Sequence, residues 1–400
     1  MSLLVVTPYV PWPADHGGRQ RTLQLLSGLV EAGHDVTAAC ITRTSEDRRA
    51  LADLALQLAV KPVALPLPPV RPWSNTDRLR KWGRLLAGQS SLLARWIGPD
   101  AIAALAATMT PTTTTIADFI WTAPLIHACG RTVDVLSTHN IESDVIAAVA
   151  RQASGTGAFG ARRESSMLAA FEHRVLREAR AAIACSHADA ESIRRTCPTT
   201  PVTLVQNGID LARLQQLPPS TSTSALLFVG SFDYPPNARA AHHLVKDWLP
   251  RLHARLPDLT VTLAGRDPEG ALVGLARPPV VTVTGRVENV RPYYESAFAA
   301  VIPLSEGGGS RIKILEAFAL GRPVITTRAG AMGLNVVDGE HLRFAESPED
   351  SAAILAEWRS TPQPMLTIIR QARAWVTRHH DWARLRPGFA EAITRKGPSA

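Results

Sequence analysis

The sequence predicts an α/β protein built from two doubly wound domains. Its 400 residues exceed what one hydrophobic core usually serves. Short apolar runs alternate with segments of helical periodicity in both halves, and the alternation restarts after a stretch rich in Pro, Ser and Thr, "LQQLPPSTSTS". We therefore expect an N-terminal domain at 1–213, a linker at 214–224, a second domain at 225–365, and a C-terminal helix at 366–400 that can pack back on the first domain.

The two halves repeat the same order of elements. In the first half the predicted strands are 3–10, 34–41, 112–120, 133–140, 181–186 and 202–208, and the predicted helices are 19–33, 165–179 and 187–197. In the second half the predicted strands are 225–230, 259–265, 280–285, 299–304 and 323–327, and the predicted helices are 237–256, 290–297, 311–320 and 365–385. Open parallel sheets of this kind bind ligands at the carboxyl ends of their strands.

A glycine loop lies at one such strand end. Gly307, Gly308 and Gly309 follow the predicted strand 299–304 in the stretch "SEGGGSRIKILEAFALG". Glycine has no β-carbon, so these amides can approach a ligand closely. Ser310 is a good N-cap for the helix that follows, whose first amides favour an anion. The loop therefore predicts a phosphate site.

Charged residues open this helix. Arg311 and Lys313 place two cations near its start, where the helix dipole alone would disfavour them. Glu316 follows and could accept hydrogen bonds from sugar hydroxyls. The alternative is a long turn before an ordinary helix, with Lys313 and Glu316 as a surface pair worth a few tenths of a kcal/mol.

Composition limits the class of protein. The apolar fraction is 46% and the charged fraction 20%, which is typical of a soluble globular protein. No run approaches the roughly 18–20 apolar residues of a membrane span. The start, "MSLLVVTPYVPWP", reads as a buried strand because it has no basic region before its prolines, so we expect a cytoplasmic protein.

Cysteines and charge limit the partners. The four cysteines form no C-x-x-C pair, so reduced thiols are expected, and no metal site or bound cofactor is indicated. The net charge of +8 implies an anionic partner, which could be a nucleotide sugar, an anionic lipid surface or nucleic acid. Nucleic acid is disfavoured because no nucleic-acid motif accompanies the charge.

Seven motifs, in order, carry a family resemblance. They read "HGGRQRTLQLLSGLVEAGHDV", "STHNIES", "AIACSHADAESI", "LVQNGID", "FVGSFDYPPNARA", "GRVENVRPYYESAFAAVIPL" and "GGGSRIKILEAFALGRPVITTRAGAMGL". This chain resembles the retaining glycosyltransferases of family 4 from about residue 4 to residue 358. The resemblance implies the GT-B fold, in which two Rossmann-like domains face each other across a cleft.

The resemblance also implies an activity. In that family the C-terminal domain binds a nucleotide diphosphate sugar and the N-terminal domain holds the acceptor, without a metal ion. The sequence has no D-x-D motif, in keeping with this. The "GGGSRIK" version resembles a subgroup associated with exopolysaccharide sugar transfer. A glycan, a lipid-linked sugar or a small molecule is then the acceptor, in polysaccharide or glycoconjugate biosynthesis.

The resemblance assigns donor-binding residues in the second domain. Glu316 matches the glutamate that bonds the donor ribose. The first glutamate of the family's E-x7-E motif falls at Gly308, and Glu306 lies two residues earlier. Gly230 matches the glycine after the first strand of this domain, but the family's arginine and lysine positions read Ser231 and about Asn237.

We interpret the missing cations as a relocated phosphate clamp. Arg311 and Lys313, with the amides of the glycine loop, would then neutralise the diphosphate from the other side. Both cations, together with His139, are the predicted catalytic residues, because the leaving diphosphate gains negative charge during transfer.

The resemblance assigns further residues in the first domain. Gly17 and Gly18 match a glycine loop near the donor phosphates, although the residues alone are equally compatible with a tight βα turn. His139 matches a histidine near the reacting sugar. Arg19, Asn140 and Glu142 are acceptor-side candidates.

The segment 71–98 suggests a membrane contact. It holds six Arg or Lys residues against one acidic residue, interleaved with Trp73, Trp82 and Trp96. It reads either as an interfacial helix on anionic lipid or as a solvated basic helix whose tryptophans pack inward. The first reading predicts a peripheral protein on the inner membrane face with a lipid-linked acceptor.

Two other functions are compatible with the motifs. A nucleotide-sugar epimerase of the same fold would bind the donor but need no acceptor. A catalytically silent nucleotide-sugar-binding protein would explain the missing glutamate and cations.

Overall fold

The chain folds into two compact units. The computed structural model describes residues 1–69, 83–85, 87–152, 155–220, 223–267, 270–306 and 311–394. One unit comprises Met1–Gln206 together with Leu385–Ala400, and the other comprises Asn207–Arg384. The boundary between the two units, after Gln206, therefore lies before residue 214, where the linker was expected to begin.

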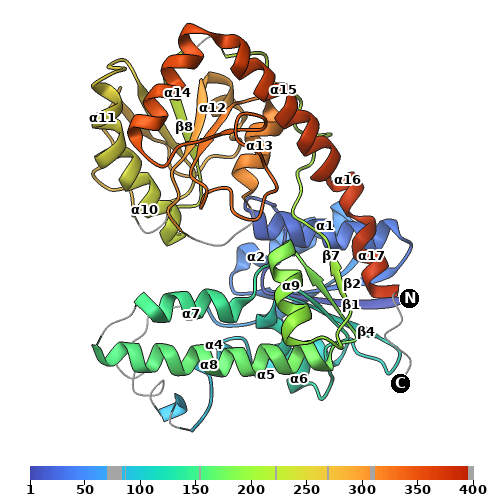
Figure 1. Cartoon of the computed structure of the whole chain (residues 1–400). Coiled ribbons are helices and arrows are strands. Elements are labelled where there is room, and N and C mark those ends of the chain that lie inside the picture. Colours follow the sequence, from blue (N-terminus) through green and yellow to red (C-terminus); the bar gives the residue numbers. More distant parts are fainter. Residues whose placement is uncertain are drawn as a thin grey trace. The chain divides into compact units, whose positions relative to one another are not determined.

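The first unit is a parallel α/β layer structure (Figure 1). Its strands are β1 Ser2–Thr7, β2 Asp35–Thr42, β3 Val60–Pro66, β4 Thr114–Asp118, β5 Val135–Ser137, β6 Ala181–Ala184 and β7 Val202–Leu204. Its helices are α1 Gly17–Glu31, α2 Ser45–Gln57, α4 Ser91–Ala94, α5 Pro99–Ala106, the 3-10 turn Ile120–Thr122, α6 Ala123–Ala128, α7 Glu142–Gln152, α8 Gly155–Glu178, α9 His187–Thr196 and α17 Pro387–Thr394.

The strand order of this unit creates a ligand-binding position. The described residues form a seven-stranded sheet in the order β3-β2-β1-β4-β5-β6-β7, with parallel pairing throughout. Its apolar strand residues are buried on both faces, as parallel sheets require. The order reverses between β1 and β4, and such switch points open a crevice at the carboxyl ends of the strands.

The second unit repeats this layer structure. Its strands are β8 Ala225–Val229, β9 Thr260–Ala264, β10 Val281–Val283, β11 Ala299–Ile302, β12 Val324–Thr326 and β13 Arg343–Phe344. Its helices are α10 Pro235–His243, the π-helical segment Leu244–Trp248, α11 Leu249–His253, α12 Arg291–Ser296, α13 Ile312–Leu320, α14 Pro348–Ser360, α15 Pro362–His379 and α16 Trp382–Leu385.

The second sheet has its own switch point. Its described strands run β10-β9-β8-β11-β12-β13, all parallel, so the order reverses between β8 and β11. The predicted helix 237–256 is interrupted by the π-helical segment just before Pro250. Proline has no N–H to donate to the carbonyl of residue 246, which loosens the helical ladder there. Two doubly wound domains are confirmed.

The described part of the predicted linker packs on the second unit. Leu217 is 3% exposed, and its N–H donates to Leu320 O at 3.1 Å. Arg322 Nη1 donates to Pro218 O at 2.9 Å. Apolar and hydrogen-bonded contacts therefore hold this stretch against the end of α13, which its polar composition does not indicate.

The chain leaves the second unit beside the point where it enters. Ile209 N–H donates to His380 O at 2.7 Å, and Trp382 N–H donates to Ile209 O at 3.1 Å. The predicted helix 365–385 is therefore broken at His380 into α15 and α16.

The last described helix, α17, returns to the first unit and lies beside α1 (Figure 1). Arg386 pairs with Glu31, and the buried ring of Phe389 lies 5.4 Å from the Arg21 guanidinium carbon. Within the described residues, each helix is too short or too polar to cross a membrane.

Candidate functional site

Polar side chains gather at the switch point of the first unit. Asp118 ends β4 and is fully buried. Its Oδ1 lies 2.9 Å from His139 Nε2, and its Oδ2 accepts from Thr22 Oγ1 at 2.5 Å. Thr22 comes from α1 and His139 from the loop after β5, so the network joins three elements at the carboxyl ends of neighbouring strands. The sequence motifs did not single out Asp118 or Thr22 as site residues.

The His139 ring is held by a stacking contact and by its hydrogen bond to Asp118. The Phe119 ring stacks on it with centroids 3.6 Å apart, and Phe119 itself has a left-handed φ of 73°. Cys185 Sγ lies 3.0 Å from His139 O, and burial raises the pKa of this thiol to about 12, so it remains a donor. Burial lowers the pKa of His139 even though Asp118 opposes the shift. With Nε2–H on Asp118, the neutral ring offers Nδ1 as an acceptor for a hydroxyl group.

The predicted glycines begin α1. Its N-cap is His16, whose side chain accepts from Arg19 N–H at 3.4 Å, and Gly17 is its first residue. A β-carbon on Gly18 would lie 2.6 Å from the Tyr9 hydroxyl oxygen, so a side chain there would require Tyr9 to move. The Arg19 guanidinium bonds Asp15 Oδ1 at 3.0 Å and so folds back on its own loop.

The two other acceptor-side candidates lie together at the start of α7. Asn140 Nδ2 donates to Glu142 Oε1 at 3.4 Å. The carboxylate of Glu172 accepts from Glu142 N–H and Ser143 N–H, both at 3.1 Å, and so caps the helix start. Burial raises the pKa of Glu142 to about 7, the Asn140 hydrogen bond opposes the rise, and Glu172 adds to it.

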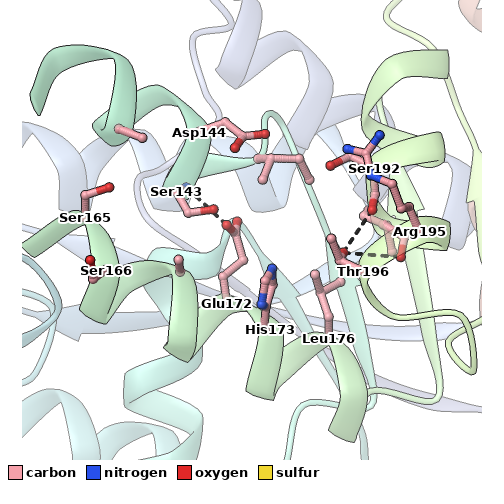
Figure 2. A pocket seen from close by; sticks show the side chains of 14 residues that line it. Ser143, Asp144, Ser165, Ser166, Glu172, His173, Leu176, Ser192, Arg195 and Thr196 are labelled. Carbon is pink, nitrogen blue, oxygen red and sulfur yellow. Dashed lines mark hydrogen bonds between the residues drawn. The ribbon is translucent and has the colours of Figure 1, made fainter. Parts of the chain in front are cut away.

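A polar cavity of about 350 Å³ lies behind this helix start. Figure 2 shows Ser143 and Asp144 of α7 facing Glu172 and His173 of α8, with Arg195 of α9 on another side. The predicted site residues do not line this cavity. Glu172 links the two regions, since one carboxylate borders the cavity and holds the backbone of Glu142.

Two glycines bring the loops after β8 and β9 together at the switch point of the second unit. Gly265 has φ of 141°, and a β-carbon there would lie 1.8 Å from Gly230 O. Gly230 N–H donates to Ala264 O at 3.0 Å, and Phe232 N–H donates to Arg266 O at 2.8 Å. Only glycine fits at residue 265, whereas a β-carbon on the predicted site residue Gly230 would face the Asn237 side chain at 3.3 Å.

Lys313 points at this pair of loops. Its Nζ donates to Asn237 Oδ1 at 2.5 Å and lies 4.8 Å from the centre of the Phe228 ring. Asn237 Nδ2 in turn donates to Ser231 O at 2.8 Å. A β-carbon on Gly230 would be 3.6 Å from the ammonium, so the glycine leaves the charge open to a ligand. The lysine thus occupies the place of the cation expected at Asn237.

Lys313 and Glu316 titrate near neutral pH. Burial, with the charge of Arg311, lowers the pKa of Lys313 to about 7. Burial raises the pKa of Glu316 to about 7, and Lys313 opposes this rise. Within the described part of the chain, the Glu316 carboxylate has no hydrogen bond or ion pair, so both its oxygens can accept from a ligand.

Arg311, the other cation of the predicted phosphate clamp, is held by backbone carbonyl groups. The Arg311 guanidinium donates to Ala329 O at 2.8 Å and Met332 O at 3.3 Å, and only 7% of the residue is exposed. Arg311 has a left-handed φ of 48° and is itself the N-cap of α13, so the prediction of Ser310 as N-cap is wrong. The left-handed conformation of Arg311 changes the direction of the chain directly before α13.

The glycine loop itself is not described. Gly307, Gly308, Gly309 and Ser310 lie outside the described residues. Glu306, just before them, pairs with Arg239 of α10 at 2.6 Å.

Arg266, which the motifs did not single out, reaches the loop after β8. Its Nε donates to Ser231 Oγ at 2.7 Å, and its Nη2 donates to Asp233 Oδ2 at 2.6 Å. It therefore brings a guanidinium to Ser231, the position where the family has an arginine. The signal was an arginine directly after the glycine that ends a strand, in "TLAGRDP".

The basic segment 71–98 is described only in part, since residues 70–82 and 86 lie outside the described residues. Ser90 Oγ and Ser91 N–H both donate to the Glu164 carboxylate of α8. The Trp96 ring stacks on Trp121 at 6.1 Å. Its described end is therefore packed on the first unit. Within the described residues, no three His, Cys, Asp or Glu side chains form a group that could hold a metal ion.

Two sequence families match consecutive parts of the chain. "Glycosyl transferase 4-like domain" matches residues 16–208, and "Glycosyl transferases group 1" matches residues 223–359. Glycogen synthase of Mycobacterium tuberculosis is 30% identical over 232 residues, which are 54% of this chain and 55% of that protein. The chain thus spans about half the length of the curated relatives it matches.

Solved structures match over nearly the whole chain. Sucrose-phosphate synthase from Thermosynechococcus elongatus has a TM-score of 0.70 at 17% identity, covering 98% of both chains. HepE of Anabaena in complex with UDP-glucose has a TM-score of 0.64 at 16% identity, covering 98% of this chain and 100% of the other. The glycosyltransferase WaaG has a TM-score of 0.61 at 15% identity, covering 98% and 99%. These structural similarities show the GT-B fold, and the two family matches place a glycosyl transferase 4-like domain and a group 1 glycosyl transferase domain one after the other along the chain.

Proposed function

We propose that this protein transfers a sugar, with retention at the anomeric carbon, from a nucleoside diphosphate sugar to a glycan or lipid-linked acceptor. Lys313 and Glu316 on α13 support this most directly. A cation and a free carboxylate one helical turn apart at the switch point of the second sheet suit the diphosphate and the ribose of one nucleotide. HepE was solved with UDP-glucose, so UDP-glucose is the first donor to test.

The main requirement of the reaction is stabilisation of the leaving diphosphate. The bond between the anomeric carbon and the β-phosphate oxygen breaks, and a bond from the acceptor oxygen forms on the same face of the sugar. The acceptor hydroxyl loses its proton, which the departing phosphate can accept. Negative charge therefore grows on the diphosphate as it leaves, and the Lys313 ammonium lowers the barrier by neutralising it.

The first unit supplies groups for the sugars. His139 is assigned to the donor sugar, because its neutral ring can accept from a hydroxyl through Nδ1 while Asp118 holds the other nitrogen. Gly17 and Gly18 are assigned to the donor phosphates through the α1 amides. Asn140 and Glu142, which share a hydrogen bond, are assigned to the acceptor, and Arg19 remains a weaker candidate because Asp15 holds its guanidinium.

Substitution tests the assignment of α13. Lys313→Ala and Glu316→Ala should each lower kcat/KM at least tenfold, since each removes a charged hydrogen-bonding group from the donor. Lys246→Ala is the matched control, because Lys246 is an exposed lysine of the same unit. Circular dichroism and thermal unfolding should show that all three variants are folded.

Two outcomes would contradict the proposal. Turnover at the wild-type rate in either α13 variant would remove these residues from the reaction. Conversion of the donor to an epimer in the absence of acceptor would identify an epimerase instead, and binding of donor without any hydrolysis or transfer would identify a binding protein. Thermal-shift screening of UDP, GDP and ADP sugars selects the donor for these assays.

An anionic membrane surface is the proposed location of the acceptor. The basic segment 71–98 is the reason, although its described end packs on the first unit through Trp96 and Ser90. The protein should sediment with anionic vesicles at low salt and be released at high salt. Absence of sedimentation would favour a glycan acceptor in solution and a cytoplasmic enzyme.

A further inference from the structure

We propose that Arg266 is a second diphosphate-binding residue, which works as a pair with Lys313 on either side of the loop after β8. This inference rests on the proposed function, because it needs a nucleoside diphosphate in the second unit. It adds a residue that neither the motifs nor the comparisons assign.

The position of Arg266 follows from the sheet. It is the second residue after β9, and β9 is the hydrogen-bonded neighbour of β8. The contact between Gly265 and Gly230 brings the two loops together at the carboxyl ends of these strands. The hydrogen bond from Phe232 N–H to Arg266 O then fixes the Arg266 backbone beside the β8 loop. Arg266 therefore lies at the edge where open parallel sheets bind ligands.

The guanidinium of Arg266 is oriented but not used up. Ser231 Oγ and Asp233 Oδ2 accept one N–H each from Nε and Nη2, and Ser231 Oγ also donates to Asp233 Oδ1 at 2.6 Å. An arginine carries five N–H donors, so three remain for a ligand. The side chain is 41% exposed. A fork held by two contacts and open on its other side is preorganised for a phosphate.

Arg266 and Lys313 are connected through one loop. Lys313 Nζ bonds Asn237 Oδ1, Asn237 Nδ2 bonds Ser231 O, and Arg266 Nε bonds Ser231 Oγ. Two cations from different elements thus share Ser231 as a common support. A diphosphate carries charge on both phosphates, and two cations on one frame can contact one phosphate each.

The competing interpretation is that Arg266 only clips the two loops together and binds no ligand. Arg266 and Asp233 form a partly exposed ion pair, and such pairs contribute little to stability. A clip of this kind would lower the melting temperature slightly when broken and would treat all nucleotides alike. The two interpretations therefore differ in how the variants respond to the number of phosphates.

The experiment compares nucleotides by calorimetry. UDP and UMP, GDP and GMP, and ADP and AMP are titrated into the wild type, Arg266→Gln and Arg266→Lys. In the matched control Arg251→Gln, the arginine belongs to the same unit and forms an exposed pair with Glu349. For the base that the wild type prefers, Arg266→Gln should weaken the diphosphate about tenfold and the monophosphate less. Arg266→Lys should fall between, because it keeps the charge but loses the fork.

The outcomes separate the inference from the proposed function. A wild type that binds none of the diphosphates would overturn both. A wild type that prefers a diphosphate, with an unchanged preference in Arg266→Gln, would overturn only the role of Arg266. Loss of preference in Arg266→Gln but not in Arg251→Gln, with melting temperatures that stay close together, would support it. If Arg266→Gln does not fold, Arg266→Lys carries the same comparison.

Discussion

The switch points of the two sheets have the same topology but opposite chemistry. In the first unit the polar groups are buried and bond one another, with Asp118 joined to both His139 and Thr22. In the second unit Lys313 bonds Asn237 of α10 and Arg266 bonds Ser231 of the loop after β8, and both keep donors for a ligand. The first region therefore orients the His139 ring, whereas the second brings two cationic side chains close to the same loop.

The difference shows what each region can contribute to transfer. A closed network in a low-dielectric interior holds one geometry, which suits contacts with a neutral sugar. Lys313 and Glu316 have pKa values near 7 because burial disfavours their charged forms. In the proposed function, an anionic ligand would restore the charge of Lys313 on binding. The charge of the second region would then depend on its ligand.

Asp118→Ala should break the first region most strongly. It leaves His139 and Thr22 buried without their acceptor, so we expect a loss of about 3 kcal/mol in the free energy of unfolding. Asp35→Ala is the control, because Asp35 forms an exposed pair with Lys61 at 2.8 Å and should cost less than about 1 kcal/mol. Urea denaturation measures both. Equal losses would mean that the network is not what holds this region together.

Lys313→Met should separate stability from activity in the second region. Donor kcat/KM should fall about a hundredfold with the cation gone. The melting temperature at pH 6 should stay the same or rise, because the buried ammonium is disfavoured in the free protein. Steady-state kinetics and thermal unfolding test the two parts. A large drop in melting temperature would show that Lys313 is mainly structural.

Donor affinity should depend on pH only through the second region. A nucleotide sugar has no ionisation of its own near neutral pH. Since the pKa of Lys313 is about 7 in the free protein, affinity should fall as pH rises above 7, by up to about tenfold per pH unit. Lys313→Arg stays charged and should flatten the profile, and Glu316→Gln tests the carboxylate separately. A steep profile that survives in Lys313→Arg would assign the titration to another group.

Glu142→Gln should give the smallest effect and belongs to the first region. The pKa of Glu142 is raised to about 7, so its contribution to stability is complete below its unfolded pKa and is lost as pH rises through 7. Glutamine carries no charge. The variant should therefore gain about 1 kcal/mol relative to wild type between pH 6 and pH 7. Urea denaturation at both pH values measures this gain, and a constant difference would show that the group does not titrate there.

Much of the fold was predictable because local sequence patterns indicate its strands and helices. Apolar runs found β1, β2, β8 and β9, and the glycines of α1 were placed correctly at its first residues. The helix 45–57 and the strand 60–66 were missed. The break at Leu244–Trp248 was also missed, although Pro250 indicates it. Periodicity detects a helical face but not a local change of hydrogen-bond pattern.

The candidate site was predicted less completely. The interpretation of Lys313 as a relocated cation agrees with its contact to Asn237, although its role with a donor stays a prediction. The same interpretation for Arg311 also stays a prediction, and carbonyl groups of Ala329 and Met332 accept from its guanidinium. Arg266, which the motifs did not single out, brings a guanidinium to Ser231. Both arginines read alike in the sequence, since each lies near a glycine at a strand end.

The sequence by itself determined the two-domain α/β plan, the family resemblance and the residues from which the sites are built. Only the tertiary structure decided which of those residues meet. Asp118 contacts His139 because the sheet places β4 beside β5, and Lys313 contacts Asn237 across 76 residues of chain. Strand order, side-chain direction and burial are long-range properties. They set the partners and the pKa values of these groups, and no local pattern contains them.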